Sequence, residues 1–166
     1  MMPPPVRKYL VSAIAGTPDV VECMLKDVHA DDPRWDFRPV PGRFTLREVV
    51  AHLADWEPIH LERLQRMVTE DNPSLPNVDE EKTAIDNDYA HSDPHGSMEW
   101  LRGGRQKLVQ QFQALTDDEW SRRGNRELIG EVTVETHAVF IAAHDGYHTR
   151  QIAQWLLQAD AALPGK

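Results

Sequence analysis

The chain has 166 residues, 40% hydrophobic and 27% charged, which predicts one globular domain over 1–166 that buries a core without disulfides. Its 18 basic and 27 acidic residues give a formal net charge of -9, which disfavours binding to nucleic acid or to anionic membranes. No apolar run reaches the roughly 18 residues of a membrane span, and the Pro-rich start resembles no secretory signal, so we expect a cytoplasmic protein.

Cys23 is the only cysteine, so it forms no disulfide within the chain. It lies among apolar residues at helical spacing, and we expect a thiol in the core rather than a nucleophile. A reducing cytoplasm is the simplest compartment for such a chain.

Apolar residues at intervals of mostly three and four predict a first helix over 6–28. Pro18 interrupts this pattern. It either kinks the helix or begins a restarted helix with Thr17 as the N-cap.

The segment 31–42 contains three prolines and a glycine, which indicates a loop. We expect Trp35 and Phe37 to attach this loop to the core. The two ends of the chain, 1–5 and 161–166, are expected to be flexible.

A second helix over 46–67 has a clear start, because Thr45 and Glu48 form the Thr-x-x-Glu pattern of a capping box. Pro58 within it removes one backbone donor and is expected to kink the helix. The acidic, Pro-containing segment 69–94 has no sustained periodicity and predicts a long crossover, with a short helix over 80–89.

A third helix is predicted over 96–115, where the glycine pair 103–104 permits either a bend or the close approach of another helix. A turn at 116–120 and a loop at 124–130 follow, and then a fourth helix over 133–159. The first half of this last helix is apolar nearly all round, as is typical of a central helix. With no convincing strand, the chain is predicted to be an all-α four-helix bundle with a long crossover between helices two and three.

Three of the eight histidines lie on one face of the fourth helix. His144 and His148 are four residues apart, hence about 40° apart around the axis, a spacing with which two imidazoles hold one metal ion. His137 lies about 10 Å away along the axis and is predicted to line the cavity above the ion. A third ligand must come from another helix, and the second helix offers His52 and, two turns on, His60.

A pair of histidines at this spacing is common without a metal, and the same residues also fit a hydrogen-bonded polar core. Their conjunction on a central helix favours a metal, because leucine or isoleucine would cost less to bury there.

Two segments resemble one known family, the DinB/YfiT-like superfamily. Segment 141–152 resembles its C-terminal signature, in which two histidines four residues apart precede a glutamine and an apolar residue. Segment 44–56 resembles its second-helix motif, which contains a histidine of its own. The order of elements agrees along nearly the whole chain. The resemblance implies a four-helix bundle with an up-down-down-up course.

The same resemblance implies one divalent ion, zinc or nickel, on three histidines that correspond here to His52, His144 and His148. Characterised relatives include thiol-dependent transferases and an isomerase that uses a low-molecular-weight thiol. Members of the family often pair as homodimers. In many of them glycine occupies the position of Arg150, whose side chain here either binds an anionic substrate or, more in keeping with its position, is exposed.

Further residues are expected around the ion or behind its ligands. Asp145 either orients an imidazole or, as the stronger expectation, forms a salt bridge or meets solvent. Trp56 and Trp155 share faces with the ligands and either wall the pocket or fill the core. Tyr147 either donates a proton to substrate or makes a surface or dimer contact, and Gln151 continues the histidine face.

Three neutral imidazoles leave the ion its full charge, so it acidifies a bound water or thiol near neutral pH. This favours a metal-dependent enzyme on small molecules, and the resemblance favours a thiol (S-)transferase with a low-molecular-weight thiol as cosubstrate. A metal-dependent hydrolase is one alternative. A non-catalytic metal- or ligand-binding helical module is the other.

Overall fold

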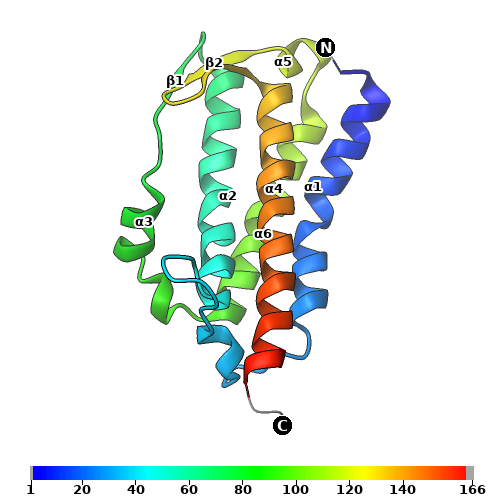
Figure 1. Cartoon of the computed structure of the whole chain (residues 1–166). Coiled ribbons are helices and arrows are strands. Elements are labelled where there is room, and N and C mark those ends of the chain that lie inside the picture. Colours follow the sequence, from blue (N-terminus) through cyan, green and yellow to red (C-terminus); the bar gives the residue numbers. More distant parts are fainter. Residues whose placement is uncertain (1, 164–166) are drawn as a thin grey trace.

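The computed structural model describes residues 2–163, in which four long helices form a bundle (Figure 1). Helices α1 and α6 run in one direction along the bundle and α2 and α4 run in the other. This is the predicted up-down-down-up course, so the four-helix-bundle fold class is confirmed. No helix in this part of the chain is long and apolar enough to cross a membrane. The four helices are α1 (Pro4–Leu25), α2 (Leu46–Thr69), α4 (Pro94–Ala114) and α6 (Val134–Ala162).

Two separate apolar clusters hold the bundle together, one toward each end. One contains Leu53 and Ile152 and the other Leu64 and Ile141, together with residues of α1 and α4. The buried side chains between the two clusters are mostly polar. Polar groups are costly to bury, so this middle layer marks the part of the bundle where function is expected. Its members include Thr17, Glu57, His60, Arg105, Asp145, His148 and Gln151.

The helix starts follow the local sequence closely. The predicted capping box exists, since Thr45 accepts from the backbone of Glu48 (3.3 Å) and Glu48 accepts from the backbone of Thr45 (2.6 Å). Thr133 caps α6 in the same way with Thr136. The short α5 (Asp117–Trp120) occupies the predicted turn after α4.

Helix α1 is continuous through Pro18, so the predicted alternative of a restarted helix is wrong. Proline at this position removes the donor that would bond the carbonyl of Ile14, four residues earlier. Arg105 of α4 donates to that carbonyl instead (2.6 Å). The side chain of Thr17 does not cap a helix but donates to Asp145.

Two further expectations for α1 and the chain ends are corrected. Cys23 is exposed rather than buried, because it lies two residues from each of the buried Val21 and Leu25 and therefore on the opposite side of the helix. Within the segments 1–5 and 161–166, expected to be flexible, Pro4 and Pro5 begin α1 and residues 161–162 end α6. Met1 and residues 164–166 lie outside the described part of the chain.

The crossover between α2 and α4 contains the predicted short helix, α3 (Glu80–Asp86), with Asp79 as its N-cap. A 3-10 turn, η2 (Tyr89–His91), follows and packs against α2. The crossover therefore runs along the outside of α2 (Figure 1).

A small sheet corrects the expectation that the chain has no strand. Strand β1 (Ser74–Leu75) pairs in parallel with β2 (Arg123–Arg126), which forms an antiparallel hairpin with β3 (Gly130–Thr133). The sequence Arg-Gly-Asn-Arg of β2 shows no apolar alternation, because Gly124 and Arg126 occupy its buried side. The sheet covers the end of the bundle where α6 begins (Figure 1).

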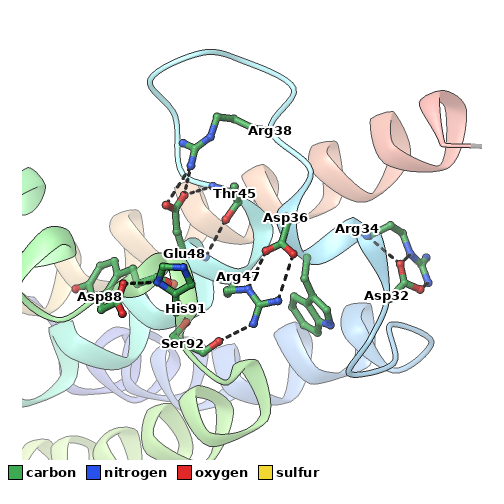
Figure 2. A network of polar contacts seen from close by, with 12 residues as sticks. Asp32, Arg34, Asp36, Arg38, Thr45, Arg47, Glu48, Asp88, His91 and Ser92 are labelled. Carbon is green, nitrogen blue, oxygen red and sulfur yellow. Dashed lines mark hydrogen bonds and ion pairs between the residues drawn. The ribbon is translucent and has the colours of Figure 1, made fainter.

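The connection from α1 to α2 is held against the start of α2 by charged side chains, as Figure 2 shows. Arg47 pairs with Asp36 (2.9 Å) and donates to the carbonyl of Ser92 (2.7 Å), which also joins the end of the crossover. Arg38 pairs with Glu48 (2.9 Å). These contacts fix the stretch that leads into α2 from both sides.

The aromatic residues of this connection behave differently. Trp35, in the 3-10 turn η1 (Pro33–Asp36), is buried in the core and donates to the carbonyl of His29 (2.8 Å). Phe37 is only half-buried and lies outside both apolar clusters. The expected attachment of the loop to the core is therefore confirmed for Trp35.

Candidate metal centre

Three histidines converge in the middle of the bundle, His52 from α2 and His144 and His148 from α6. One ligand nitrogen from each lies within 4.8 Å of the others. The Nε2 atoms of His52 and His144 are 3.1 Å apart. The helix spacing of four residues and the packing of α2 on α6 thus bring together the three residues that the sequence predicted as ligands.

This geometry fits a metal ion. Two imidazole nitrogens bound to one zinc ion at about 2.0–2.1 Å in a tetrahedral arrangement lie about 3.3 Å apart. The observed Nε2–Nε2 distance is close to that value. Among the described residues, no further histidine, cysteine or acidic side chain joins the cluster. A divalent ion bound here would have three imidazole donors from the described chain and would keep a coordination position for another molecule.

Burial keeps the three imidazoles neutral. Desolvation is the largest cause in each case, and it lowers the pKa of His52 to about 2, that of His144 to about 3 and that of His148 to about 4. The histidines also lower one another's pKa, because two positive charges so close together repel. Neutral imidazole is the form that binds metal, so no proton has to leave at neutral pH.

Gln151 fixes the orientation of one ligand. Its side-chain oxygen accepts a hydrogen bond from Nδ1 of His148 (3.0 Å), one turn earlier on α6. This bond places the proton of His148 on Nδ1 and leaves Nε2 free for a metal ion. Gln151 itself is buried. The sequence placed Gln151 on the histidine face, among the residues expected around the ion or behind its ligands, and the structure shows which ligand it contacts.

Aromatic rings enclose the ligands. The ring of Trp56 lies 5.8 Å from His52 and 5.2 Å from His144, and Phe44 lies 5.2 Å from His52. Trp56 is buried, so it forms a wall of the site as well as part of the bundle interior. Trp155 is farther down α6, where its Nε1 donates to the carbonyl of Phe44 (2.7 Å). Trp155 therefore positions Phe44 and donates its hydrogen bond to that residue, not to one of the three histidines.

Tyr147 lies at the solvent side of the site, with its side chain 41% exposed. Its ring is 4.9 Å from the ring of His148. Arg43, from the connection before α2, donates to the Tyr147 hydroxyl and stacks on the same ring. This pair joins the connection to α6 beside the ligands. Arg150 is exposed, in agreement with the stronger of its two expectations.

Asp145 is buried and forms a salt bridge with Arg105 of α4 rather than a hydrogen bond to a ligand imidazole, which is the stronger of its two expectations. Arg105 also pairs with Glu57 of α2 (2.6 Å), and Thr17 of α1 donates to Asp145 (2.7 Å). Burial opposes the charge of Arg105, yet its bonds to Asp145 and Glu57 raise its pKa. One ion network thus joins all four helices directly behind the histidine cluster.

A second pair of histidines lies next to the first cluster, on the side toward the sheet. His137 is buried, and its Nε2 donates to the carbonyl of His60 (3.3 Å). The rings of His60 and His137 are 5.5 Å apart, and His60 is 5.9 Å from His144. His137 therefore lines the region beside the cluster, as its distance along the helix predicted, and does not join the three ligand nitrogens.

The fold and the site define a four-helix-bundle protein with a three-histidine candidate metal centre. The model of the DinB superfamily matches residues 11–152, and the chain belongs to that superfamily. This confirms the resemblance seen in segments 44–56 and 141–152.

Relatives agree with this assignment. The chain is 27% identical over 135 residues to the "Putative metal-dependent hydrolase YfiT" of Bacillus subtilis, covering 79% of this chain and 71% of that one. The protein OB0413 of Oceanobacillus iheyensis, with the same description, is 27% identical over 111 residues, or 67% of this chain. The matched part spans 64% of the length of OB0413.

A solved structure shows the same fold. The YfiT structure from Bacillus subtilis superposes with a TM-score of 0.88 at 21% identity, covering 95% of this chain and 90% of that chain. It is described as a probable metal-dependent hydrolase with an unusual four-helix bundle topology.

Several polar residues of the interior were missed by sequence reasoning. Glu57 is four residues after Leu53 and Arg105 is four after Leu101, so each occupies a core position of its helix. A charged residue at such a position was a usable signal of a buried ion network. Arg126 offered no such signal, because its strand could not be recognised.

Proposed function

We propose that this protein is a metal-dependent enzyme acting on small molecules, with zinc or nickel held by His52, His144 and His148. The observation that supports the proposal is the set of donors: three neutral imidazoles, two of them buried and that of His144 half-buried, and, among residues 2–163, no fourth ligand in the cluster. A structural zinc site is usually closed by four protein ligands, whereas a catalytic site keeps a position for water or substrate.

When bound, a divalent ion at this site lowers the pKa of a coordinated water or thiol and so supplies a nucleophile near neutral pH. The residues of the chain then have separate tasks. Gln151 holds His148 in the tautomer that exposes Nε2. Trp56 and Phe44 pack on the ligand rings and keep bulk water from them.

The reaction type we propose is thiol (S-)transfer, in which a low-molecular-weight thiol is the cosubstrate. Two buried carboxylates lie nearest to the ligands along the helices, Glu57 and Asp145, and Arg105 holds both. Neither is available as the general base that activates water in many zinc hydrolases. A thiol loses its proton on binding a metal and needs no such base.

Hydrolysis is the second candidate, and the descriptions of the relatives from Bacillus subtilis and Oceanobacillus iheyensis favour it. The two reactions are separated by their products. Thiol transfer to monochlorobimane forms a thioether and releases chloride with consumption of the thiol, whereas hydrolysis of p-nitrophenyl acetate proceeds without thiol.

The first test is the metal content of the untagged protein, measured by elemental mass spectrometry. We expect about one zinc or nickel ion per chain, as one three-histidine site holds one ion. The double variant His144→Ala, His148→Ala should lose it. The matched control is His29→Ala, His95→Ala, because both of those histidines are exposed and outside the cluster. A metal-free parent that also fails to bind micromolar zinc or nickel would contradict the proposal.

A further inference from the structure

The buried arginines of the described chain fall into two kinds. Arg7 pairs with Asp117 and Glu135, and Arg105 pairs with Glu57 and Asp145. Arg63 and Arg126 are equally buried, at 4% and 6% exposure, yet neither forms an ion pair with any described residue. A buried charge without a partner is strongly unfavourable, so Arg63, whose Nη1 is buried without a hydrogen-bond partner, needs an explanation. Arg126 adds a second positive charge that no described carboxylate neutralises.

Arg63 is on α2, two turns after Trp56. Its Nη2 donates to the carbonyl of Pro76 in the crossover (2.9 Å), but its Nη1 is buried without a partner. The guanidinium stacks 5.4 Å from the centre of the Trp56 ring. Burial, and next the positive charge of Arg126, lower its pKa to about 10, so Arg63 remains charged at neutral pH.

Arg126 reaches the same region from the sheet, at the end of β2. Its guanidinium stacks 4.3 Å from the centre of the Phe140 ring on α6 and has no hydrogen-bond partner among the described side chains. The positive charges of Arg63 and Arg126 both lower the pKa of His137, so both guanidinium groups lie in the neighbourhood of this ring.

This part of the interior adjoins the candidate metal centre. Trp56, under Arg63, is 5.2 Å from His144, and Phe140, under Arg126, is 6.4 Å from the same ring. Each arginine is therefore one aromatic ring away from a proposed ligand. The region also contains the two buried, unpartnered ring nitrogens of His60, and a neutral imidazole can offer one of these as a further donor.

We propose that Arg63 and Arg126 form a subsite for an oxyanion, a carboxylate or phosphate group of the small molecule that the metal centre acts on. Guanidinium groups bind both anions through paired, charge-assisted hydrogen bonds. This inference deepens the proposed function and rests on it for the link to catalysis, whereas anion binding at the subsite requires no metal ion.

The arginine subsite binds the anionic group of the substrate, and the metal centre acts on the reacting group at the other end of the same molecule. A substrate with a carboxylate or phosphate at one end would place its other end next to the three histidines. The negative net charge of the whole chain, -9, repels anions in general, so a local positive site is needed to bind one.

The test is calorimetric titration of the full chain with phenyl phosphate and with benzoate, with phenol as the uncharged comparison. Each titration is made on protein as purified and on protein stripped of metal by a chelator and dialysed. We expect one anion per chain in both preparations and no binding of phenol. Phenyl phosphate and benzoate also distinguish the two anion types by their relative affinities.

Arg63→Gln and Arg126→Gln should each weaken anion binding about tenfold or more, because each removes charge-assisted hydrogen bonds. The matched control is Arg123→Gln, on the same strand as Arg126 but exposed and paired with Glu131, and it should bind like the parent. Circular dichroism and thermal unfolding check that each variant folds. Should one glutamine variant not fold, Arg126→Lys, which retains the charge but not the paired donors, replaces it.

Absence of anion binding by the parent, or equal weakening in Arg123→Gln, would overturn the subsite. Anion binding only in the metal-containing preparation would overturn it too, because the anion would then be on the metal. These outcomes are separate from the metal test: a protein that binds the anions but no zinc or nickel would retain the subsite and lose the proposed enzyme.

Discussion

At the scale of single residues, the three proposed ligands are not held alike. His148 has a hydrogen-bond partner at Nδ1, the oxygen of Gln151, whereas Nδ1 of His144 is buried without one. The partner of a ligating imidazole fixes both the tautomer and the ring orientation, and its loss typically weakens metal binding 10- to 100-fold. Gln151 is thus the residue outside the donor set on which the site depends most directly.

Replacing Gln151 by alanine is expected to weaken zinc binding about tenfold while the bundle stays folded, because the imidazole of His148 loses its orienting partner. Competition with a chromophoric zinc chelator measures the change. Gln154→Ala is the matched control, since Gln154 is exposed on the same helix, one turn further from the start. Equal affinity in Gln151→Ala and the parent would show that packing alone orients His148.

At the scale of the elements, one close contact between α2 and α4 positions the ion network behind the site. A Cβ atom on Gly104 would lie 2.5 Å from Cβ of Glu57, a distance that side chains do not tolerate, whereas a Cβ on Gly103 would meet open space. Glycine at 104 therefore lets α4 approach α2 closely enough for Arg105 to reach Glu57 and Asp145. Of the two roles predicted for the glycine pair, close approach belongs to Gly104.

The two neighbouring glycines provide a matched pair of variants. Gly104→Ala should destabilise the fold by about 1–3 kcal/mol, because the added methyl group must displace α4 from Glu57. Gly103→Ala should be neutral or stabilise by up to about 1 kcal/mol, since alanine favours a helix interior over glycine. Urea unfolding monitored by circular dichroism gives both values. A larger loss in Gly103→Ala than in Gly104→Ala would contradict this account of the contact.

At the scale of the whole molecule, the buried histidines link stability to pH. Burial is the largest cause that lowers the pKa of His137 to about 4 and that of His60 well below its usual value, and the three proposed ligands behave likewise. In the unfolded chain these imidazoles take up protons near pH 6.5. Their contribution to stability is therefore complete above about pH 6.5 and is lost as the pH falls toward the folded-state values.

Metal-free protein should accordingly unfold on mild acidification. Below about pH 6.5 each such histidine removes roughly 1.4 kcal/mol of unfolding free energy per pH unit, until its folded form is protonated as well. Urea titrations at pH 7.5 and 5 in the absence of metal measure the loss. His29→Gln, a change at an exposed histidine, should leave the profile unaltered. Equal stability at the two pH values would mean that the buried imidazoles become protonated without unfolding.

The helices and most of the proposed donors were predictable because their signals are local. Periodic apolar residues, the capping box at Thr45 and the four-residue spacing of His144 and His148 lie within one or a few turns of chain. Such patterns indicate which face of a helix is buried in the bundle. The match of two separated motifs to one family then added His52 from a different helix.

Contacts between distant segments depended on the packing of the whole chain. Leu75 pairs with Arg126 across the crossover, and Arg105 meets Asp145 only after α4 and α6 pack together. Neither pairing can be recognised from a periodic sequence pattern. A strand of a few polar residues has no apolar alternation, and a single charged residue on a helix does not indicate which residue it will contact. Cys23 is a different case, because its spacing of two residues from Val21 and from Leu25 places it on the far side of the helix from both. The sequence by itself determined the histidine pair of α6, because the four-residue spacing of its members is a local pattern within one helix. Only the tertiary structure brings Arg63 and Arg126 near these histidines, because they lie on segments far apart in the chain and no local pattern indicates their proximity.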